Sequence, residues 1–132
     1  IQYCTSNVTA EEETEFLKLM APAGRLDAVP EGLIDAASCV SGCGPAWVYQ
    51  FIEALADAAV KHGIVRADAY RMASQMVVGT GKLQLATGQH PAVMKDAVCS
   101  PGGTTIVGVG ELERKRFRGA VIDAIDAIQD KK

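Results

Sequence analysis

Apolar residues recur at helical spacing through most of this chain, from about residue 31 to the end. The pattern predicts two long helices, over residues 45–62 and 66–87. Gly63 is expected to end the first as a left-handed cap, and Gly88 to end the second. In the second helix the apolar residues spread around much of the circumference. We therefore expect that helix to be buried on more than one side.

Shorter helices are predicted over residues 33–40, 91–98, 103–115 and 117–129, the first of them stopping at a break over residues 41–44. Several small residues permit close approach between the helix backbones: Ala54, Ala56, Ala58, Ala59, Gly79 and Gly81. Such residues indicate either ordinary core packing or an intertwined helical dimer whose apolar helices are covered by a second chain. We expect the dimer.

Residues 1–30 follow a different pattern, a strand at 1–4, a helix, and a second strand at 25–29. Thr9 and Glu12 predict a capping box at the start of the helix, in which each side chain accepts a hydrogen bond from the other residue's backbone N–H. Two strands and one helix cannot form a stable unit alone, so we expect the end of a larger α/β sheet. The absence of an initiator Met supports the same expectation.

Composition and charge exclude several classes of function. The 132 residues are 48% hydrophobic and carry a formal net charge of −3, so there is no electrostatic basis for binding nucleic acid or an anionic membrane. One basic cluster, residues 114–118, is interpreted as a solvated helix end or turn. No stretch reaches transmembrane length, and we expect neither nucleic acid nor a membrane as a partner.

The cysteines and histidines are Cys4, Cys39, Cys43, Cys99, His62 and His90. Their spacing matches no zinc pattern, so no metal site is expected. A chain this rich in core residues does not need disulfides, which predicts free thiols and a reducing, cytoplasmic compartment. No triad or paired-carboxylate site emerges, and Lys95–Asp96 is either surface charge or support for the turn after it.

Candidate chemistry is concentrated in one turn, whose residues are Ser100, Pro101, Gly102, Gly103, Thr104 and Thr105. The proline fixes one backbone angle, the glycines remove side-chain bulk, and two hydroxyls follow as the next helix begins. A helix N-terminus with exposed N–H groups and partial positive charge can bind a small anion such as a carboxylate. The alternative is that one threonine is simply the N-cap.

A second glycine-rich segment lies just before the first long helix. Its spacing can admit a ligand close to the backbone, which makes Ser41, Gly42, Gly44 and Pro45 candidate cofactor-binding residues. Spacing alone favours a helix–helix corner, and without a preceding strand the segment is not a complete dinucleotide fingerprint. Cys43 is not a convincing nucleophile, because neither histidine is near it in sequence.

In combination, these motifs resemble pyrroline-5-carboxylate reductases over essentially the whole chain. The matching segments are residues 33–36 and 41–46, FIEALADA at 51–58, TGQHP at 87–91, Lys95–Asp96, and SPGGTTI at 100–106. The resemblance implies a mainly α fold. An all-helical, intertwined dimerisation domain at 31–132, like the C-terminal domain of 6-phosphogluconate dehydrogenase, would follow the strand–helix–strand end of a Rossmann domain at 1–30.

The resemblance also implies an activity, the reduction of L-1-pyrroline-5-carboxylate to L-proline with NADPH or NADH. It implies a homodimer, which in some members of the family assembles further into a pentamer of dimers. The glycine loop that binds the dinucleotide is not among these 132 residues. The chain is therefore expected to be a fragment that is inactive alone.

Carried onto this sequence, the substrate carboxylate would lie at the helix N-terminus opened by residues 100–105. Thr105 would hydrogen-bond the ring nitrogen as the catalytic residue. Two positions depart from the family pattern, with Cys43 in place of a serine and Trp47 in place of a tyrosine. Two alternatives stay open: a non-catalytic dimerisation module, and the helical domain of another imine or hydroxy-acid reductase.

Overall fold

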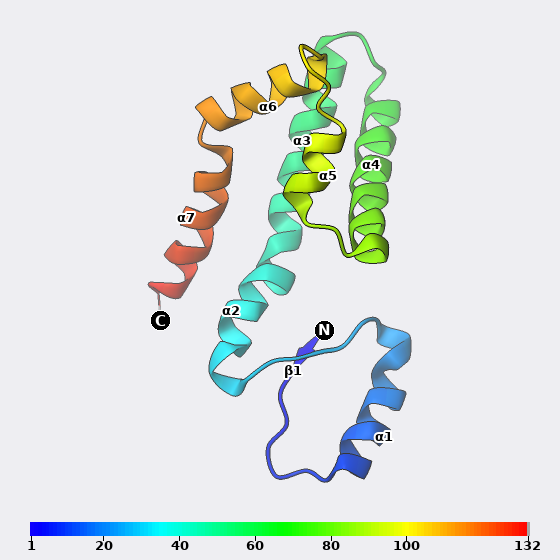
Figure 1. Ribbon diagram of the computed structural model, residues 1–132, viewed down its shortest axis with the longest axis vertical. Coiled ribbons are helices and arrows are strands. Elements are labelled where there is room, and N and C mark those ends of the chain that lie inside the picture. Colours follow the sequence, from blue (N-terminus) through cyan, green and yellow to red (C-terminus); the bar gives the residue numbers. More distant parts are fainter. Residues whose placement is uncertain (132) are drawn as a thin grey trace. The chain divides into compact units, whose positions relative to one another are not determined.

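The computed structural model describes residues 1–131 and is mainly helical, with one pair of short strands (Figure 1). This confirms the expected fold class. The chain divides into two compact units, Ile1–Pro45 with the chain from Ile122 onward, and Ala46–Val121. The main elements in order are β1 (Gln2–Tyr3), α1 (Ala10–Met20), β2 (Asp27–Ala28), α2 (Ile34–Ser38), α3 (Gly44–Lys61), α4 (Arg66–Thr87), α5 (Pro91–Ala97), α6 (Thr104–Arg114) and α7 (Phe117–Gln129).

The first unit contains the predicted strand–helix–strand. β1 and β2 pair in parallel, with Tyr3 opposite Ala28. The capping box is present, because Thr9 Oγ1 accepts from the Glu12 N–H at 3.2 Å and Glu12 Oε2 accepts from the Thr9 N–H at 2.7 Å. Tyr3 also packs its ring on Phe16 of α1, with 5.6 Å between the centroids, and so ties the helix to the strand.

The predicted break at residues 41–44 is wrong, because the chain stays helical from α2 into α3. The connection is a π-helical turn, Cys39–Cys43, closed by the Gly44 N–H donating to the carbonyl of Cys39, five residues earlier. Pro45 explains the wide turn. It has no N–H to donate, and in an ordinary α-helix its ring would crowd the carbonyl of Ser41. A π turn relieves that crowding without ending the helix.

Glycine caps end the two long helices of the second unit, as predicted. Gly63 has a φ of +97°. The Ile64 N–H donates to the carbonyl of Ala59 and the Gly63 N–H to that of Val60, both at 3.0 Å, which is the Schellman pattern. Gly88 closes α4 in the left-handed region at φ +63°.

Side-chain contacts connect α3 to its neighbours within this unit. Asp57 of α3 forms an ion pair with Arg66 in the first turn of α4, and the hydrogen bond between them raises the pKa of the Arg66 guanidinium. The same guanidinium lies 5.6 Å from the centre of the Tyr70 ring. Phe51 contacts Phe117 at the start of α7, with 6.0 Å between ring centroids.

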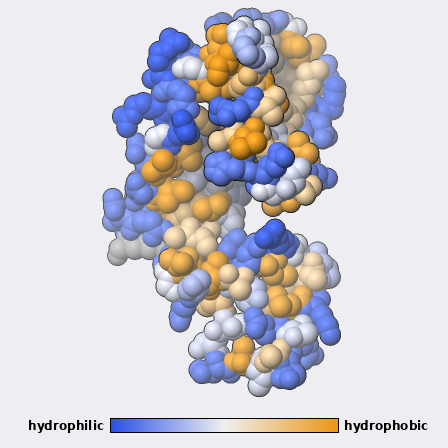
Figure 2. Space-filling model, in the orientation of Figure 1, coloured by the Kyte–Doolittle hydropathy of each residue, from blue (hydrophilic) through white to orange (hydrophobic). Residues whose placement is uncertain are grey.

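The buried core of the single chain is very small. Among the described residues the buried apolar ones are Cys39, Ala56, Ala69 and Ala73. Figure 2 shows hydrophobic residues, in orange, on the molecular surface. On α4 the exposed large apolar residues are Tyr70, Met72, Met76, Val78, Leu83 and Leu85. Within one chain, α4 is therefore not buried on more than one side.

The solvent-accessible area also indicates that the single chain buries little of its surface. The chain exposes 10022 Å². A compact monomer of this mass would expose about 6,700 Å², and even two separate compact units would expose about 8,000 Å² together. The chain thus exposes about 2,000 Å² more than two separate compact units would.

Gly88→Ala is expected to lower the free energy of unfolding by about 1 kcal/mol, because a side chain is strained at positive φ. Urea denaturation of the 132-residue chain measures this. The control is Gly32→Ala, since Gly32 does not have a positive φ and an added Cβ meets no atom within 4 Å. Equal losses in the two variants would contradict the assignment of Gly88 as a conformationally required cap.

Candidate functional site

The turn between α5 and α6 has a defined hydrogen-bonded geometry. The Gly103 N–H donates to the carbonyl of Ser100 at 3.0 Å, across Pro101 and Gly102. Gly102 has a φ of +69°. Proline at the second position and a positive-φ glycine at the third are the features of a type II turn. Local sequence therefore determines the shape of this turn.

Gly103 is the N-cap of α6, with φ −74° and ψ 169°. Space rather than dihedral angle favours glycine there. A Cβ at this position would collide with Ser100 Oγ and lie 3.2 Å from the carbonyl oxygen of Ser100. A side chain at residue 103 would therefore force the Ser100 hydroxyl and carbonyl to shift.

The first turn of α6 carries no side-chain cap, so the alternative in which a threonine serves as N-cap is wrong. Thr104 and Thr105 are both exposed. No side-chain hydrogen bond involves either hydroxyl within the described part of the chain. No acidic residue lies in this first turn to compete for the N–H groups. The helix end therefore offers N–H and hydroxyl donors to a small anion.

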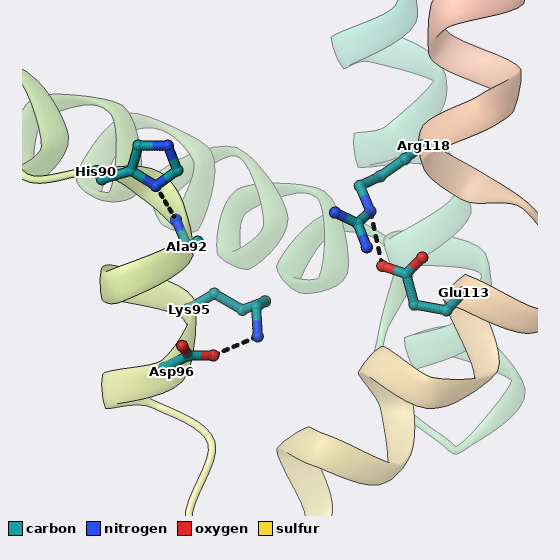
Figure 3. A network of polar contacts seen from close by, with 6 residues as sticks. All are labelled: His90, Ala92, Lys95, Asp96, Glu113 and Arg118. Carbon is teal, nitrogen blue, oxygen red and sulfur yellow. Dashed lines mark hydrogen bonds and ion pairs between the residues drawn. The ribbon is translucent and has the colours of Figure 1, made fainter.

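Figure 3 shows ion pairs on the flanking helices, and their side chains are exposed. Lys95 forms an ion pair with Asp96 on α5, and the hydrogen bond between them raises the pKa of the lysine. Glu113 accepts from Arg118 Nε at 2.9 Å across the α6–α7 connection. The basic cluster at 114–118 is thus a helix end and turn, as predicted. His90 caps α5, accepting from the Ala92 N–H through Nδ1 at 3.2 Å.

The second glycine-rich segment lies in the first unit, at the π turn and the start of α3. Neither Gly42 nor Gly44 has a positive φ, and added Cβ atoms would make only ordinary contacts, at 3.4 Å and 3.9 Å. Internal packing therefore does not require glycine at either position. Their lack of side chains leaves the backbone accessible, which fits close approach of another molecule.

Two contacts of this segment were not found from the sequence. The Ser41 hydroxyl donates to Gln2 Oε1 of β1, and Gln129 Nε2 of α7 donates to Cys39 Sγ at 3.0 Å. The partners are 39 and 90 residues apart. No local pattern signals a contact at such separation.

All four cysteines are free, and Cys39 is buried. Among residues 1–131, no group of three or more His, Cys, Asp or Glu side chains is arranged to hold a metal ion. In the same described residues, no helix combines the length and apolar character needed to cross a membrane.

Known proteins resemble this chain over nearly its whole length. Residues 31–132 match the family model described as pyrroline-5-carboxylate reductase dimerisation. The chain is 48% identical to the pyrroline-5-carboxylate reductase of Escherichia coli K12 over 124 residues, covering 94% of this chain and 46% of that protein.

Solved structures show the same similarity. A Plasmodium falciparum pyrroline carboxylate reductase with NADP bound superposes with a TM-score of 0.86 at 32% identity, covering 98% of this chain and 54% of that one. The Coxiella burnetii enzyme gives a TM-score of 0.92 at 28% identity, covering 98% and 49%. The chain spans about half the length of the relatives it matches.

Gly103→Ala is expected to displace the turn and speed hydrogen exchange of the amide at residue 103, which donates to the carbonyl of Ser100. The reason is the collision of the new Cβ with Ser100 Oγ. Ser100→Ala in the same chain should restore part of the protection, because it removes that oxygen. Ser100→Ala alone serves as the control and should leave exchange nearly unchanged. Unaltered exchange in Gly103→Ala would contradict this account.

Proposed function

This chain belongs to the pyrroline-5-carboxylate reductase family, and from that premise we propose that it carries the substrate-binding half of a reductase site. The observation that carries the proposal is the Ser100–Gly103 turn at the uncapped N-terminus of α6. A module that only dimerises would need no anion-binding helix end. We propose a domain boundary between residues 30 and 31, supported by the start of the family match at residue 31.

The proposed substrate is L-1-pyrroline-5-carboxylate, and its carboxylate would bind at the start of α6. Backbone N–H groups of Gly102, Thr104 and Thr105 and the Thr104 hydroxyl are the donors, while Gly103, whose own N–H donates to Ser100, gives the carboxylate close access to the helix end. The helix dipole favours the negative charge there, and no acidic side chain of the first turn opposes it. Ser100 would contribute mainly by shaping the turn, since its carbonyl accepts from the Gly103 N–H.

Thr105 is the proposed catalytic residue. Thr105 is the second residue of α6, and its side chain is exposed. From there its hydroxyl can hydrogen-bond the ring nitrogen of a substrate whose carboxylate is held at the helix end. Reduction delivers hydride to the imine carbon and leaves a proton to be supplied at nitrogen. An oriented hydroxyl assists that proton transfer, directly or through water. Orientation of the imine against the cofactor contributes most of the rate.

NADPH or NADH is the proposed cofactor, and it supplies the hydride. Among the residues of this chain, we assign Ser41, Gly42, Gly44 and Pro45 to the cofactor side of the site. Support comes from Gly42 and Gly44, which neither dihedral angles nor internal packing require to be glycine. No glycine loop of the dinucleotide-binding kind occurs in the 132 residues, so we propose that this chain alone binds NADPH weakly.

A homodimer is the proposed assembly. Its support is the excess surface of about 2,000 Å² per chain, since obligate homodimers bury a total of about 2,000–5,000 Å². The exposed large side chains of α4 are the surface that a second copy would cover. A pentamer of dimers is the proposed larger assembly. We place the protein in the cytoplasm, which four free cysteines support.

The 132-residue chain is expected to dimerise without binding NADPH at micromolar concentration. Light scattering should give twice the 13.9 kDa of one chain, because a single chain leaves its apolar helices exposed. Titration calorimetry should show no NADPH binding in the micromolar range. A stable monomer would contradict the proposed dimer. Micromolar NADPH binding would contradict the proposal that this chain carries the substrate-binding half and binds the cofactor only weakly.

Thr105→Val in the full gene product is expected to lower kcat for pyrroline-5-carboxylate reduction by about 100-fold or more, because the hydroxyl at the ring nitrogen is lost. The dimer mass should not change, since Thr105 is exposed and makes no internal side-chain hydrogen bond. Thr14→Val is the matched control, because its hydroxyl bonds only the carbonyl of Ala10 on α1. Unchanged kinetics in Thr105→Val would remove Thr105 from the mechanism.

A further inference from the structure

The π turn Cys39–Cys43 is the irregular part of an otherwise continuous helical run. Such turns are rare and are less favourable than α-helix, so they persist where surrounding structure supports them. Pro45 accounts for the wider turn but does not fix its position relative to the strands. Contacts from elsewhere in the fold must supply that support.

Two side chains of the π turn make such contacts within the first unit. Ser41 donates its hydroxyl to Gln2 Oε1 of β1, and Cys39 accepts from Gln129 Nε2 of α7 at 3.0 Å. Cys39 is only 3% exposed, so its contact is sheltered from water. The turn is therefore connected on one side to the parallel strands and on the other to the last helix.

Two acceptors lie within hydrogen-bond distance of the Ser41 hydroxyl. It carries a single proton, and besides Gln2 Oε1 it lies 3.3 Å from the carbonyl oxygen of Ala37, four residues earlier in the helix. The contact with Ala37 is the ordinary back-bond of a serine inside a helix and connects the turn to nothing else. Of these two contacts, it is the one with Gln2 that connects the turn to the sheet.

We propose that Gln2 is a positioning residue for the glycine-rich segment, and that by accepting the Ser41 hydroxyl it holds the π turn and the start of α3 against β1. Ser41 then acts through its internal hydrogen bond, while the bare backbone at Gly42 and Gly44 faces the cofactor. The part of this inference that concerns the cofactor rests on the proposed function. The part that concerns the turn stands on the contacts alone.

Hydrogen exchange of the amides at residues 42–47, measured on the 132-residue chain, tests the positioning. Gln2→Leu keeps the side-chain size but removes the acceptor, and should speed exchange about fivefold, the effect of one hydrogen bond. Gln2→Glu keeps an acceptor oxygen and should exchange like the parent chain. Ser41→Ala should reproduce Gln2→Leu, and the double variant should add nothing further.

Ser38→Ala is the matched control, since Ser38 lies one turn earlier in the same helical run and caps nothing. It should leave exchange at residues 42–47 unchanged. Equal exchange in Gln2→Leu, Gln2→Glu and the parent chain would overturn the proposal. So would additive effects of Gln2→Leu and Ser41→Ala.

The functional consequence is measured in the full gene product. Gln2→Leu should raise KM for NADPH about fivefold and leave kcat unchanged, because a loosened segment weakens cofactor contacts without altering the substrate turn. Faster exchange with an unchanged KM would overturn the role toward the cofactor. Absence of reductase activity in the parent protein would instead overturn the proposed function, and the exchange measurements would still decide the role of Gln2.

Discussion

The constraint on which this molecule depends is that its helices carry more apolar surface than one chain can bury. The buried apolar residues among those described are one cysteine and three alanines, while α4 alone exposes six large apolar side chains. Ala56 of α3 and Ala69 and Ala73 of α4 are buried, but the larger side chains of α4 stay outside. Hydrophobic burial is the dominant favourable term in folding, so a second copy that covers these faces accounts best for the composition.

The geometry of the proposed substrate turn depends on its own local sequence. Pro101 and Gly102 set the dihedral angles of the turn. The absence of a side chain at Gly103 leaves room for Ser100 beside it. The helix that follows begins without a side-chain cap, so its N–H groups are available to a ligand. The chemistry of the site thus follows from a few residues, while its enclosure would come from the assembly.

The other glycine-rich segment depends on distant parts of the fold. Pro45 turns an expected break into a π turn, and two side chains from β1 and α7 anchor it. The sequence predicts a corner at this segment, because glycine and proline usually interrupt helices. That prediction is wrong, because the steric conflict at Pro45 is resolved by widening the helix rather than by ending it.

The sequence by itself determined the elements whose signals are local. The capping box at Thr9, the glycine caps at Gly63 and Gly88, and the bounds of α4 and α7 are found as predicted, since each depends on residues within one or two turns. Only the tertiary structure showed that Gln2 accepts from Ser41, that Gln129 reaches Cys39, and that α4 stays largely exposed in one chain. Those features depend on which surfaces meet across 39 to 90 residues of chain, and periodicity specifies an apolar face without specifying what covers it.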